Sequence, residues 1–344
     1  MKYISGRSQG VHVFTNKNTG VLFGKYNFLM NSKFFLDKKL DFDSVLMYRK
    51  TVFNAQNSFN KFNDKIKEAG LSIKPIELDI GIEKLKQKDM DRETMPVGMS
   101  GKLHNLTIKE NVKVPRFVDK IVNDDLKAEK SVNKLYERGF DNDYVSQLFS
   151  TSNLGSLKDR KFVPTRWSIT ATDDIISKNI LLNDDSESEI LFFEGEYMSN
   201  NFFVLIFPGK FEYELIEKFG DQTATDYESA FGRKNYASNT TGGYYAAKLG
   251  VMEYLKNHNL EGRVLVIRIV NPQYRKSLGV WVVREAVRKT MNKSPKRFKN
   301  VEEIKKYAKI YIADVFLKLF PQAISESKIL NNSLKQTNLA LFTR

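Results

Sequence analysis

The spacing of hydrophobic residues along the first half of the chain predicts strands followed by helices. Apolar residues on both sides of an Asn-Lys-Asn-Thr-Gly turn predict a β-hairpin near the start of the chain. Helix-spaced apolar residues over 43–70 predict a helix with a break near its middle, whereas the turn formers of 71–116 predict extended connections. Two further helices are predicted at Asp124–Arg138, ended by Gly139, and at Asp143–Phe149.

The second half of the chain predicts a sheet with helices between its strands. Phe202–Pro208 is almost entirely apolar, so we expect this strand to be buried on both faces at the centre of the sheet. The other predicted elements are strands at Ile190–Tyr197, Phe211–Glu217 and Arg263–Val270, and helices at Tyr244–Asn257, Trp281–Met291 and Val301–Leu319. Together they predict an α+β fold, a mixed sheet with surrounding helices.

A polar stretch at Gly220–Thr225 is the candidate domain boundary. It separates a larger N-terminal portion, residues 1–225, from a smaller C-terminal α/β portion, residues 226–330. Residues 331–344 are expected to form a polar tail. A chain of 344 residues, 41% hydrophobic and 28% charged, is typical of a globular protein of about two domains.

Composition also limits the possible metal and membrane chemistry. The chain has no cysteine, which excludes disulfides and thiolate metal sites, and three scattered histidines argue against a histidine zinc site. We therefore predict no metal site, and any metal would depend on carboxylates. No apolar run reaches the roughly 18 residues that span a bilayer, so we expect a cytoplasmic protein with no membrane partner.

The net charge of +14 favours partners with phosphate backbones. The steepest basic segment runs from Arg284 to Lys309, with ten Lys or Arg against three Glu. A solvated helical face is the alternative reading of such a charge run. The candidate DNA contacts in this segment are Arg288, Lys289, Lys293, Arg297 and Lys299.

Lys161–Asp174 is the segment richest in chemistry. After Pro164, apolar and polar residues alternate at the period of a strand, which places four polar side chains on one face: Arg166, Ser168, Thr170 and Thr172. An open face would offer a guanidinium and three hydroxyls to an anion, with Asp173 and Asp174 at the strand's end. The alternative is a central strand with Trp167 in the core and an aspartate capping the next helix.

Three other segments carry candidate chemistry. Gly242 and Gly243 precede a helix, where backbone N–H groups can receive a phosphate, although an ordinary loop ending gives the same pattern. Arg268 lies in a buried strand and needs an acidic partner, as a structural ion pair or as a site residue. Arg7, between Gly6 and Ser8, can form an anion-binding nest or a surface loop.

Alternating glutamates mark the strand that begins near Phe211. Glu212 and Glu214 share one face of this strand and Glu217 follows after Ile216, so these glutamates could bind a metal or pair with Arg166. We favour the simpler interpretation, in which the two carboxylates lie on an exposed face of the sheet.

The segment Val163–Asp174 (VPTRWSITATDD) strongly resembles the signature of the archaeal Nre family of DNA repair proteins. Other resemblances fall in the family's order: Tyr3–Ser8 (YISGRS), Pro96–Gly98 (PVG), Leu135–Phe140 (LYERGF), Tyr236–Leu249 (YASNTTGGYYAAKL) and Leu278–Glu285 (LGVWVVRE). These resemblances cover nearly the whole chain. One branch of the family has zinc-ribbon cysteines; this chain has none, so it is similar to the NreA branch. The resemblance implies a role in DNA damage repair and contact with the sliding clamp (PCNA), and it supplies no reaction or cofactor.

The end of the chain resembles a clamp-interacting peptide. Gln336, Leu339 and Phe342 have the spacing Q-x-x-L-x-x-F, in which a 3₁₀ turn presents apolar side chains to a hydrophobic pocket. Thr343 stands where a second aromatic residue is usual, so we expect weaker binding.

Two hypotheses of function follow. The first is a clamp-recruited DNA repair factor that binds DNA. The second is an enzyme acting on a nucleotide or a DNA lesion, either a metal-dependent nuclease or, as we favour, a nucleotide-binding site built from arginines, an aromatic and glycines. It is motivated by polar residues in the family-like motifs, with catalytic candidates Arg166, Asp173, Asp174, Glu228 and Arg268, and ligand-binding candidates Arg7, Arg233, Tyr236, Gly242, Gly243, Arg284 and Glu285. We expect Arg166 and one aspartate to line a pocket with residues 236–245.

Overall fold

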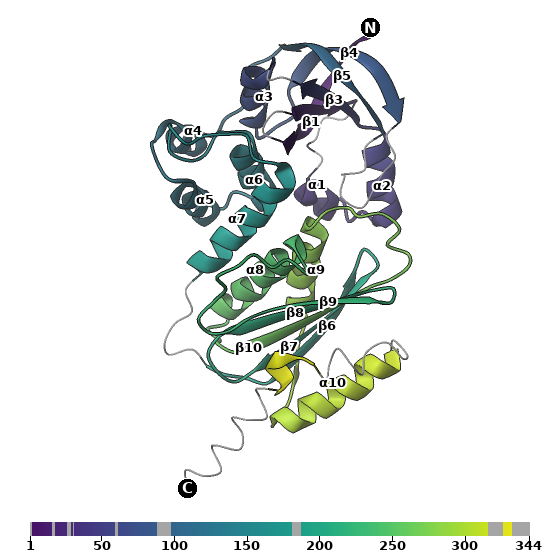
Figure 1. The fold of residues 1–344 in the computed structure, drawn as a ribbon, viewed down its shortest axis with the longest axis vertical. Helices are drawn as coiled ribbons and strands as arrows, with labels where there is room; N and C mark the ends of the chain where they lie inside the picture. Colours follow the sequence, from purple (N-terminus) through teal and green to yellow (C-terminus); the bar gives the residue numbers. More distant parts are fainter. Residues whose placement is uncertain are drawn as a thin grey trace. The chain divides into compact units, whose positions relative to one another are not determined.

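The structure is a computed structural model that describes residues 2–15, 18–25, 29, 31–58, 61–87, 98–180, 187–315 and 326–331. The chain forms two compact units (Figure 1). Unit 1 comprises Met1–Asn179 and Lys276–Gly279, and unit 2 comprises Ile180–Arg275 and Val280–Arg344. Both units combine helices and strands, which confirms the predicted α+β class. The expected division near residue 225 falls inside unit 2, within a hairpin.

Unit 1 contains a closed five-stranded barrel in the order β1-β2-β3-β5-β4. Its strands are β1 (Lys2–Thr15), β2 (Asn18–Gly24), β3 (Phe53–Ser58), β4 (Glu77–Gln87) and β5 (Met99–Ile108). β1 pairs antiparallel with both β2 and β4, and β3 pairs in parallel with β5. The predicted hairpin is confirmed as β1 and β2. Alternate residues of the strands, such as Val21, Ile80 and Leu106, fill the interior.

The helix predicted over 43–70 is confirmed with its break as α2 (Phe42–Lys50) and α3 (Asn63–Gly70), although the break contains an unpredicted strand, β3. The prediction for residues 71–116 is wrong. The expected extended connections are β4 and β5. The inward alternation of Leu78, Ile80 and Ile82 forms β4, and Gly81 between them continues the strand because it pairs with β1 on one side and β5 on the other.

The remaining helices of unit 1 are α1 (Ser32–Asp37), α4 (Arg116–Asn123), α5 (Ala128–Glu137), α6 (Asn142–Ser150) and α7 (Thr165–Asn179). The two predicted helices are confirmed as α5 and α6. Gly139 follows α5 with φ +86°, a conformation that glycine adopts without steric cost.

The strand predicted in Lys161–Asp174 is wrong, because this segment forms α7. Pro164 starts the helix: its carbonyl accepts hydrogen bonds from the amides of Trp167 (2.8 Å) and Ser168 (2.9 Å). The buried positions recur at the helical period, at Ser168, Thr172, Asp173, Ile176 and Ser177. The open face of hydroxyls does not form, and the alternative also fails, since Trp167 is 59% exposed.

Unit 2 is a six-stranded sheet in the order β11-β6-β7-β10-β8-β9. Its strands are β6 (Leu191–Tyr197), β7 (Asn200–Phe207), β8 (Glu212–Phe219), β9 (Gln222–Glu228), β10 (Arg263–Val270) and β11 (Lys296–Arg297). Its helices are α8 (Gly242–Asn257), α9 (Trp281–Met291) and α10 (Val301–Val315). β10 is antiparallel to β7 and parallel to β8. The strands and helices predicted for this half are confirmed, α10 as far as the described residues extend.

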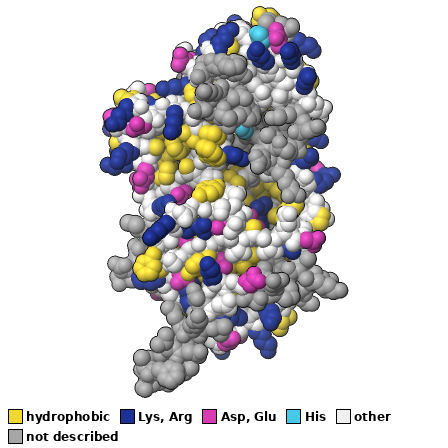
Figure 2. Space-filling view, in the orientation of Figure 1, with side chains coloured by type: hydrophobic (Ala, Val, Ile, Leu, Met, Phe, Trp, Pro, Cys, Tyr) yellow, Lys and Arg dark blue, Asp and Glu magenta, His cyan; other side chains and the backbone are white. Residues whose placement is uncertain are grey.

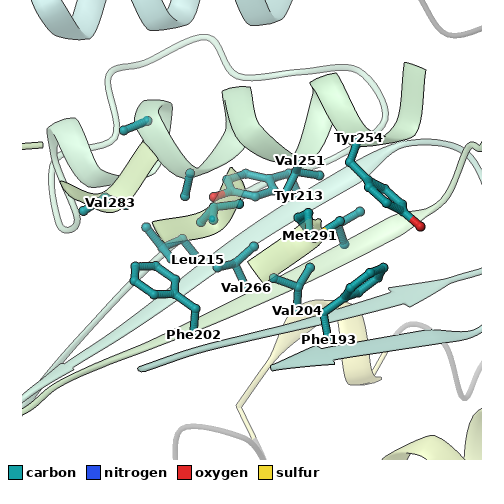
Figure 3. Close-up of a cluster of buried hydrophobic side chains, with 14 of the residues drawn as sticks. Phe193, Phe202, Val204, Tyr213, Leu215, Val251, Tyr254, Val266, Val283 and Met291 are labelled. Atoms are coloured by element: carbon teal, nitrogen blue, oxygen red, sulfur yellow. The ribbon is translucent and has the colours of Figure 1, made fainter. Parts of the chain in front are cut away.

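Each face of this sheet has its own hydrophobic core. Phe202, Tyr213 and Val266 project towards α8 and α9 (Figure 3), and Leu205 and Ile267 pack on the other face together with residues of α10. β7 is therefore buried on both faces, as predicted from its apolar run. Burying each such side chain contributes about 1.5 to 3 kcal/mol, which fixes the register of the strands that carry the polar site.

Candidate functional site

A network of buried and half-buried charged groups surrounds the amino end of α8 in unit 2. It combines residues of the sheet, of the loop that precedes α8, and of α8 itself: Glu217, Asp226, Glu228, Arg233, Lys248 and Arg268. Burying an ionised group costs free energy unless a partner compensates it, so each of these charges is placed against another.

Asp226 of β9 organises the loop before α8. One carboxylate oxygen, Oδ1, accepts a hydrogen bond from Arg233 Nη2 at 3.0 Å. The other, Oδ2, accepts from the backbone amides of Asn239 (3.0 Å) and Thr240 (2.7 Å) and from the Thr240 hydroxyl (2.9 Å). The Asp226 side chain is only 4% exposed, so these bonds are shielded from water and hold the loop to the sheet.

Arg233 and Tyr244 link this loop to the first turn of α8. The guanidinium of Arg233 lies over the Tyr244 ring, 5.0 Å from its centroid, and also donates to the Tyr227 carbonyl at 2.9 Å. Glu228, at the end of β9, pairs with Lys248 of α8 at 2.5 Å. Burial, followed by the charge of Glu228, raises the pKa of Tyr244 well above its usual value, so this phenol stays neutral at physiological pH.

Arg268 pairs with Glu217 across the parallel strands β10 and β8. Its Nη1 donates to Glu217 Oε1 at 2.6 Å, and its Nε and Nη2 donate to Asn200 Oδ1 at 2.9 and 2.7 Å. The expected acidic partner of Arg268 is thereby confirmed. A Cβ at Gly243 would lie 2.8 Å from Glu217 Oε1, so a side chain at this position would displace the carboxylate that pairs with Arg268.

The amino end of α8 is strained. Thr241, which precedes the helix, has φ 49° and ψ −131°, a conformation that a β-branched residue rarely adopts, and its side chain makes no capping hydrogen bond. Gly242 and Gly243 follow as the first helical residues. Strain of this kind persists only where surrounding contacts impose it, and it is concentrated at functional sites.

Aromatic side chains border this network. Tyr236 is 53% exposed and stacks on Tyr245 with ring centroids 5.3 Å apart. The Tyr245 hydroxyl accepts a hydrogen bond from the Ala237 amide at 3.0 Å, which fixes the segment that carries Tyr236. Of the predicted site residues, the structure brings six together around the amino end of α8: Glu228, Arg233, Tyr236, Gly242, Gly243 and Arg268.

Sequence reasoning missed Asp226, Glu217 and Lys248 as members of the network. Asp226 and Glu228 are two positions apart on β9, so their shared strand face was a signal that could have found them. Glu217 is the carboxylate opposite Arg268 in register, which only the pairing of β8 with β10 reveals.

Arg284 and Glu285 belong to a second buried cluster, on α9. Glu285 Oε1 accepts from Arg284 Nε at 3.3 Å and from Arg288 Nη1 at 2.8 Å. Arg288 also makes two bonds to Glu253 of α8, from Nε at 2.7 Å and from Nη2 at 2.5 Å. This bidentate pair joins α8 to α9, so the Arg288 guanidinium is used in ion pairs within unit 2.

The other candidate DNA contacts lie at and beyond the end of α9. Lys289 is above the Tyr197 ring, 3.7 Å from its centroid. Burial, followed by the charge of Glu285, raises the pKa of Tyr197 to about 12. Lys293, Arg297 and Lys299 are exposed. Arg297 pairs with Glu189 at 3.1 Å.

The candidates of unit 1 are distributed over α7 and the barrel. Arg166 is exposed, Asp173 is fully buried and accepts a hydrogen bond from Asn142 at 3.2 Å, and Asp174 pairs with Lys178 at 2.6 Å. Arg7 pairs with Glu110 at 2.5 Å. The expected pocket formed by Arg166 and an aspartate with residues 236–245 stays a prediction.

The glutamates of β8 do not form an exposed face, so that prediction is wrong. Glu214 is fully buried and accepts hydrogen bonds from the Ser327 hydroxyl (2.6 Å) and from the amides of Lys328 (3.2 Å) and Ile329 (3.1 Å). α10 and residues 327–330 cover this side of the sheet, which the glutamate pattern could not indicate. Glu212 accepts from the Tyr227 hydroxyl at 2.8 Å.

Within the described ranges, no three His, Cys, Asp or Glu side chains are grouped as metal ligands. Likewise, none of the helices that the structure describes has the length and apolar composition needed to cross a membrane. The clamp-binding candidates Gln336, Leu339 and Phe342 lie outside the described residues.

Comparison with known proteins defines the family. The family description "Archaeal Nre, N-terminal" matches residues 19–225, and "Archaeal Nre, C-terminal" matches residues 228–342. The chain therefore belongs to the archaeal Nre family, as its motifs predicted. No solved structure matches it.

Three curated relatives give the degree of similarity. The chain is 36% identical over 252 residues to the DNA repair protein NreA of Archaeoglobus fulgidus and 33% identical over 257 residues to that of Haloferax volcanii. It is 30% identical over 273 residues to the DNA repair protein NreB of Archaeoglobus fulgidus. The NreA matches include 70% and 69% of this chain but only 64% and 61% of the relatives, so the chain matches less than two thirds of either NreA protein.

Proposed function

We propose that this protein is a cytoplasmic DNA repair factor that binds DNA and is recruited by the sliding clamp. The observation that carries the proposal is the match of both halves of the chain to one family, three of whose members are named DNA repair proteins. DNA contact and clamp recruitment are the parts that need direct tests, and each depends on a separate region of unit 2.

The proposed duplex contact uses the exposed basic residues after α9. Lys and Arg side chains are spread over the face in Figure 2, with Asp and Glu between them, so a contact has to be argued from individual residues. Lys293 and Lys299 are exposed and form no ion pair among the described residues. Arg288 and Arg297 already pair with carboxylates, so neutralising them would also remove internal contacts. We therefore assign the phosphate contacts to the two lysines.

Replacing both lysines, Lys293→Gln with Lys299→Gln, should weaken duplex binding and reduce its salt dependence. Each lost phosphate contact lowers the slope of log K against log salt by about 0.9. The measurement is fluorescence anisotropy with a labelled duplex at several salt concentrations. The matched control is Lys130→Gln with Lys134→Gln, two exposed lysines of α5. Equal slopes for the two double variants would refute the assignment.

The C-terminal tail begins at a fixed point on unit 2. Glu214 receives three hydrogen bonds from residues 327–329, and Ile329 and Leu330 are buried in the core beside α10. Asn331 is therefore anchored five positions before Gln336. Five residues span at most about 18 Å, so the proposed peptide would hold the clamp close to this side of unit 2.

Glu214→Gln should release residues 327–331 from the sheet. The carboxylate accepts three bonds in a buried site, and hydrogen bonds to a charged group contribute about 1.5 to 3 kcal/mol each. We expect faster hydrogen exchange at the amides of Lys328 and Ile329. Glu212→Gln on the same strand, whose carboxylate bonds Tyr227, is the control. Unchanged exchange in Glu214→Gln would contradict the anchoring role.

A second candidate function is nucleotide binding at the amino end of α8. It is favoured by the strained Thr241 beside Gly242 and Gly243, with the half-exposed Tyr236 ring next to the network. Calorimetric titration with nucleoside triphosphates tests it. Tyr236→Ala should weaken binding if the ring stacks on the base, and absence of heat with the unaltered chain would dismiss this candidate.

A further inference from the structure

The barrel of unit 1 has the strand order of the oligonucleotide-binding (OB) fold. That fold is a five-stranded Greek-key barrel in which β1 pairs with β2 and β4, and β3 pairs in parallel with β5. All of these pairings are present here. A helix between β3 and β4 closes one end of such barrels, and α3 occupies this place, with Ile66 and Ala69 in the barrel core.

A β-bulge lets β1 pair with both β2 and β4. The register shifts between Ser8 and Gly10, and Gly10 has φ +135°, which a residue with a side chain adopts only under strain. The first half of β1 pairs with β4, and the second half pairs with β2. The barrel thus has two distinct outer faces that meet at this bend.

Residues on the outer face beside β2 and β3 are buried. Leu22 and Asn54, which point outwards from these strands, are each 3% exposed. On β1, a Cβ at Gly10 would lie 3.7 Å from the Gln147 side chain of α6. A ligand therefore has access to the opposite outer face, which we call the Tyr3 face. It is formed by the first half of β1 with β4 and β5, and its outward residues are Tyr3, Ser5, Arg7, Glu77, Asp79, Gly81, Glu83, Lys102, His104, Asn105 and Thr107.

Tyr3 presents an aromatic ring at the centre of this face. Tyr3, Gly81 and Asn105 are aligned in register on three adjacent strands. A Cβ at Gly81 would lie 3.2 Å from Tyr3 Cε1, so the glycine lets the ring rest on the backbone of β4. The side of the ring away from the sheet stays in water, and Tyr3 is 72% exposed. A core residue would bury this area, whereas a stacking platform leaves it open.

The charges around the ring leave an excess of lysine. The acidic side chains of this face are Glu77, which is exposed, Asp79, which accepts from Ser5 (2.6 Å) and pairs with Lys109 (2.8 Å), and Glu83, which lies 2.8 Å from His104 Nε2. Lys102 and, at a bulge in β4, Lys84 and Lys86 are exposed, and in the described part of the chain none of these three is in an ion pair. Lys84 has φ +51°, so the bulge turns the strand locally and changes the direction of its side chain.

We propose that the Tyr3 face binds single-stranded nucleic acid. Tyr3 stacks on one base, and the lysines at the bulge and on β5 contact the adjacent phosphates, the combination of an aromatic platform and basic side chains that holds single strands. The face differs from the β2–β3 face that oligonucleotides occupy on other OB barrels. A duplex keeps its base faces inside its own stack, so it cannot use the ring. The site is therefore selective for unpaired strands, and it is distinct from the duplex contact proposed for Lys293 and Lys299 of unit 2.

The test is equilibrium binding of the full chain to a labelled 15-nucleotide oligothymidylate, followed by fluorescence anisotropy. Tyr3→Ala should weaken binding by about 5- to 150-fold, the loss of one base stack. Tyr3→Phe keeps the ring and should bind within about twofold of the unaltered chain. Lys84→Gln with Lys102→Gln should reduce the salt slope by about 0.7 for each lost contact.

Controls separate this site from the duplex contact and from a general effect on the surface. Phe231, fully exposed in unit 2, provides the matched variant Phe231→Ala, which should bind oligothymidylate normally. Duplex binding should be unchanged in Tyr3→Ala, and single-strand binding should be unchanged in the Lys293 and Lys299 double variant, so either proposal can fail alone. Oligouridylate tested in parallel distinguishes DNA from RNA. Normal binding by Tyr3→Ala, or an equal loss in Tyr3→Phe, would overturn the proposal.

Discussion

Asp226→Ala should lower the free energy of unfolding of unit 2 by about 3 to 5 kcal/mol, a large fraction of the stability of an ordinary domain. The substitution removes the acceptor of four hydrogen bonds: one from Arg233, two from the amides of Asn239 and Thr240, and one from the Thr240 hydroxyl. It also leaves Arg233, whose side chain is 19% exposed, without its carboxylate. Removing one partner of a buried pair costs more than the pair contributes, because the remaining charge stays buried.

Urea unfolding followed by circular dichroism measures this loss. Asp221→Ala, at an exposed position of the β8–β9 hairpin, is the matched control and should change stability by less than about 0.5 kcal/mol. Asp226→Asn keeps the shape and one acceptor oxygen and should give an intermediate value. If Asp226→Ala unfolds within about 1 kcal/mol of the unaltered chain, the loop before α8 is held by other contacts and the network is not its organiser.

This prediction also concerns the candidate site. The Asp226 bonds fix the loop that carries Tyr236 and leads into the strained Thr241, so releasing them should let Thr241 relax. A nucleotide that binds at the amino end of α8 would then bind more weakly to the part of the protein that stays folded. Loss of stability without loss of nucleotide binding would indicate that the network is purely structural.

Most elements of unit 2 could be predicted from the sequence because most of its strands are apolar runs bounded by turn formers, whereas the polar strand β9, which carries Asp226 and Glu228, was predicted in part as a domain boundary. Arg263–Val270 and Trp281–Met291 were predicted at the observed bounds. In unit 1, the alternation of Trp167, Ile169 and Ala171 with polar residues fits the period of a strand. The residues that are buried in α7, such as Ser168, Thr172 and Ile176, instead recur every four residues, the period of a helix. A short segment does not distinguish these periods when its small and hydroxylated side chains can be buried in either.

The sequence predicts what type of partner a site residue needs, but not which residue supplies it. Arg268 needed an acid, but Glu217 is 51 positions away, and its identity follows from the parallel register of β10 with β8. The same holds for Arg288, which the sequence places in a basic segment and the fold places against Glu253 of α8. Charge runs describe composition, whereas free positive surface depends on which side chains the tertiary structure neutralises.

Phe342→Ala should abolish detectable binding of this chain to the sliding clamp. A peptide of residues 333–344 should bind the clamp alone, since Leu339 and Phe342 each bury an apolar side chain worth about 1.5 to 3 kcal/mol. With Thr343 in place of a second aromatic residue, the remaining free energy after ordering the peptide corresponds to about micromolar affinity.

Surface plasmon resonance with immobilised clamp measures this binding, with Thr343→Ala as the control because the side chain it removes contributes little apolar area. Because Glu214 anchors residues 327–331, truncation of the chain gives a second, independent test. A chain truncated after Asn331 keeps that anchor and its buried Ile329 and Leu330, so it should fold normally and yet fail to bind the clamp. Binding by the truncated chain at the strength of the full chain would move recruitment away from the C-terminal peptide and onto another surface.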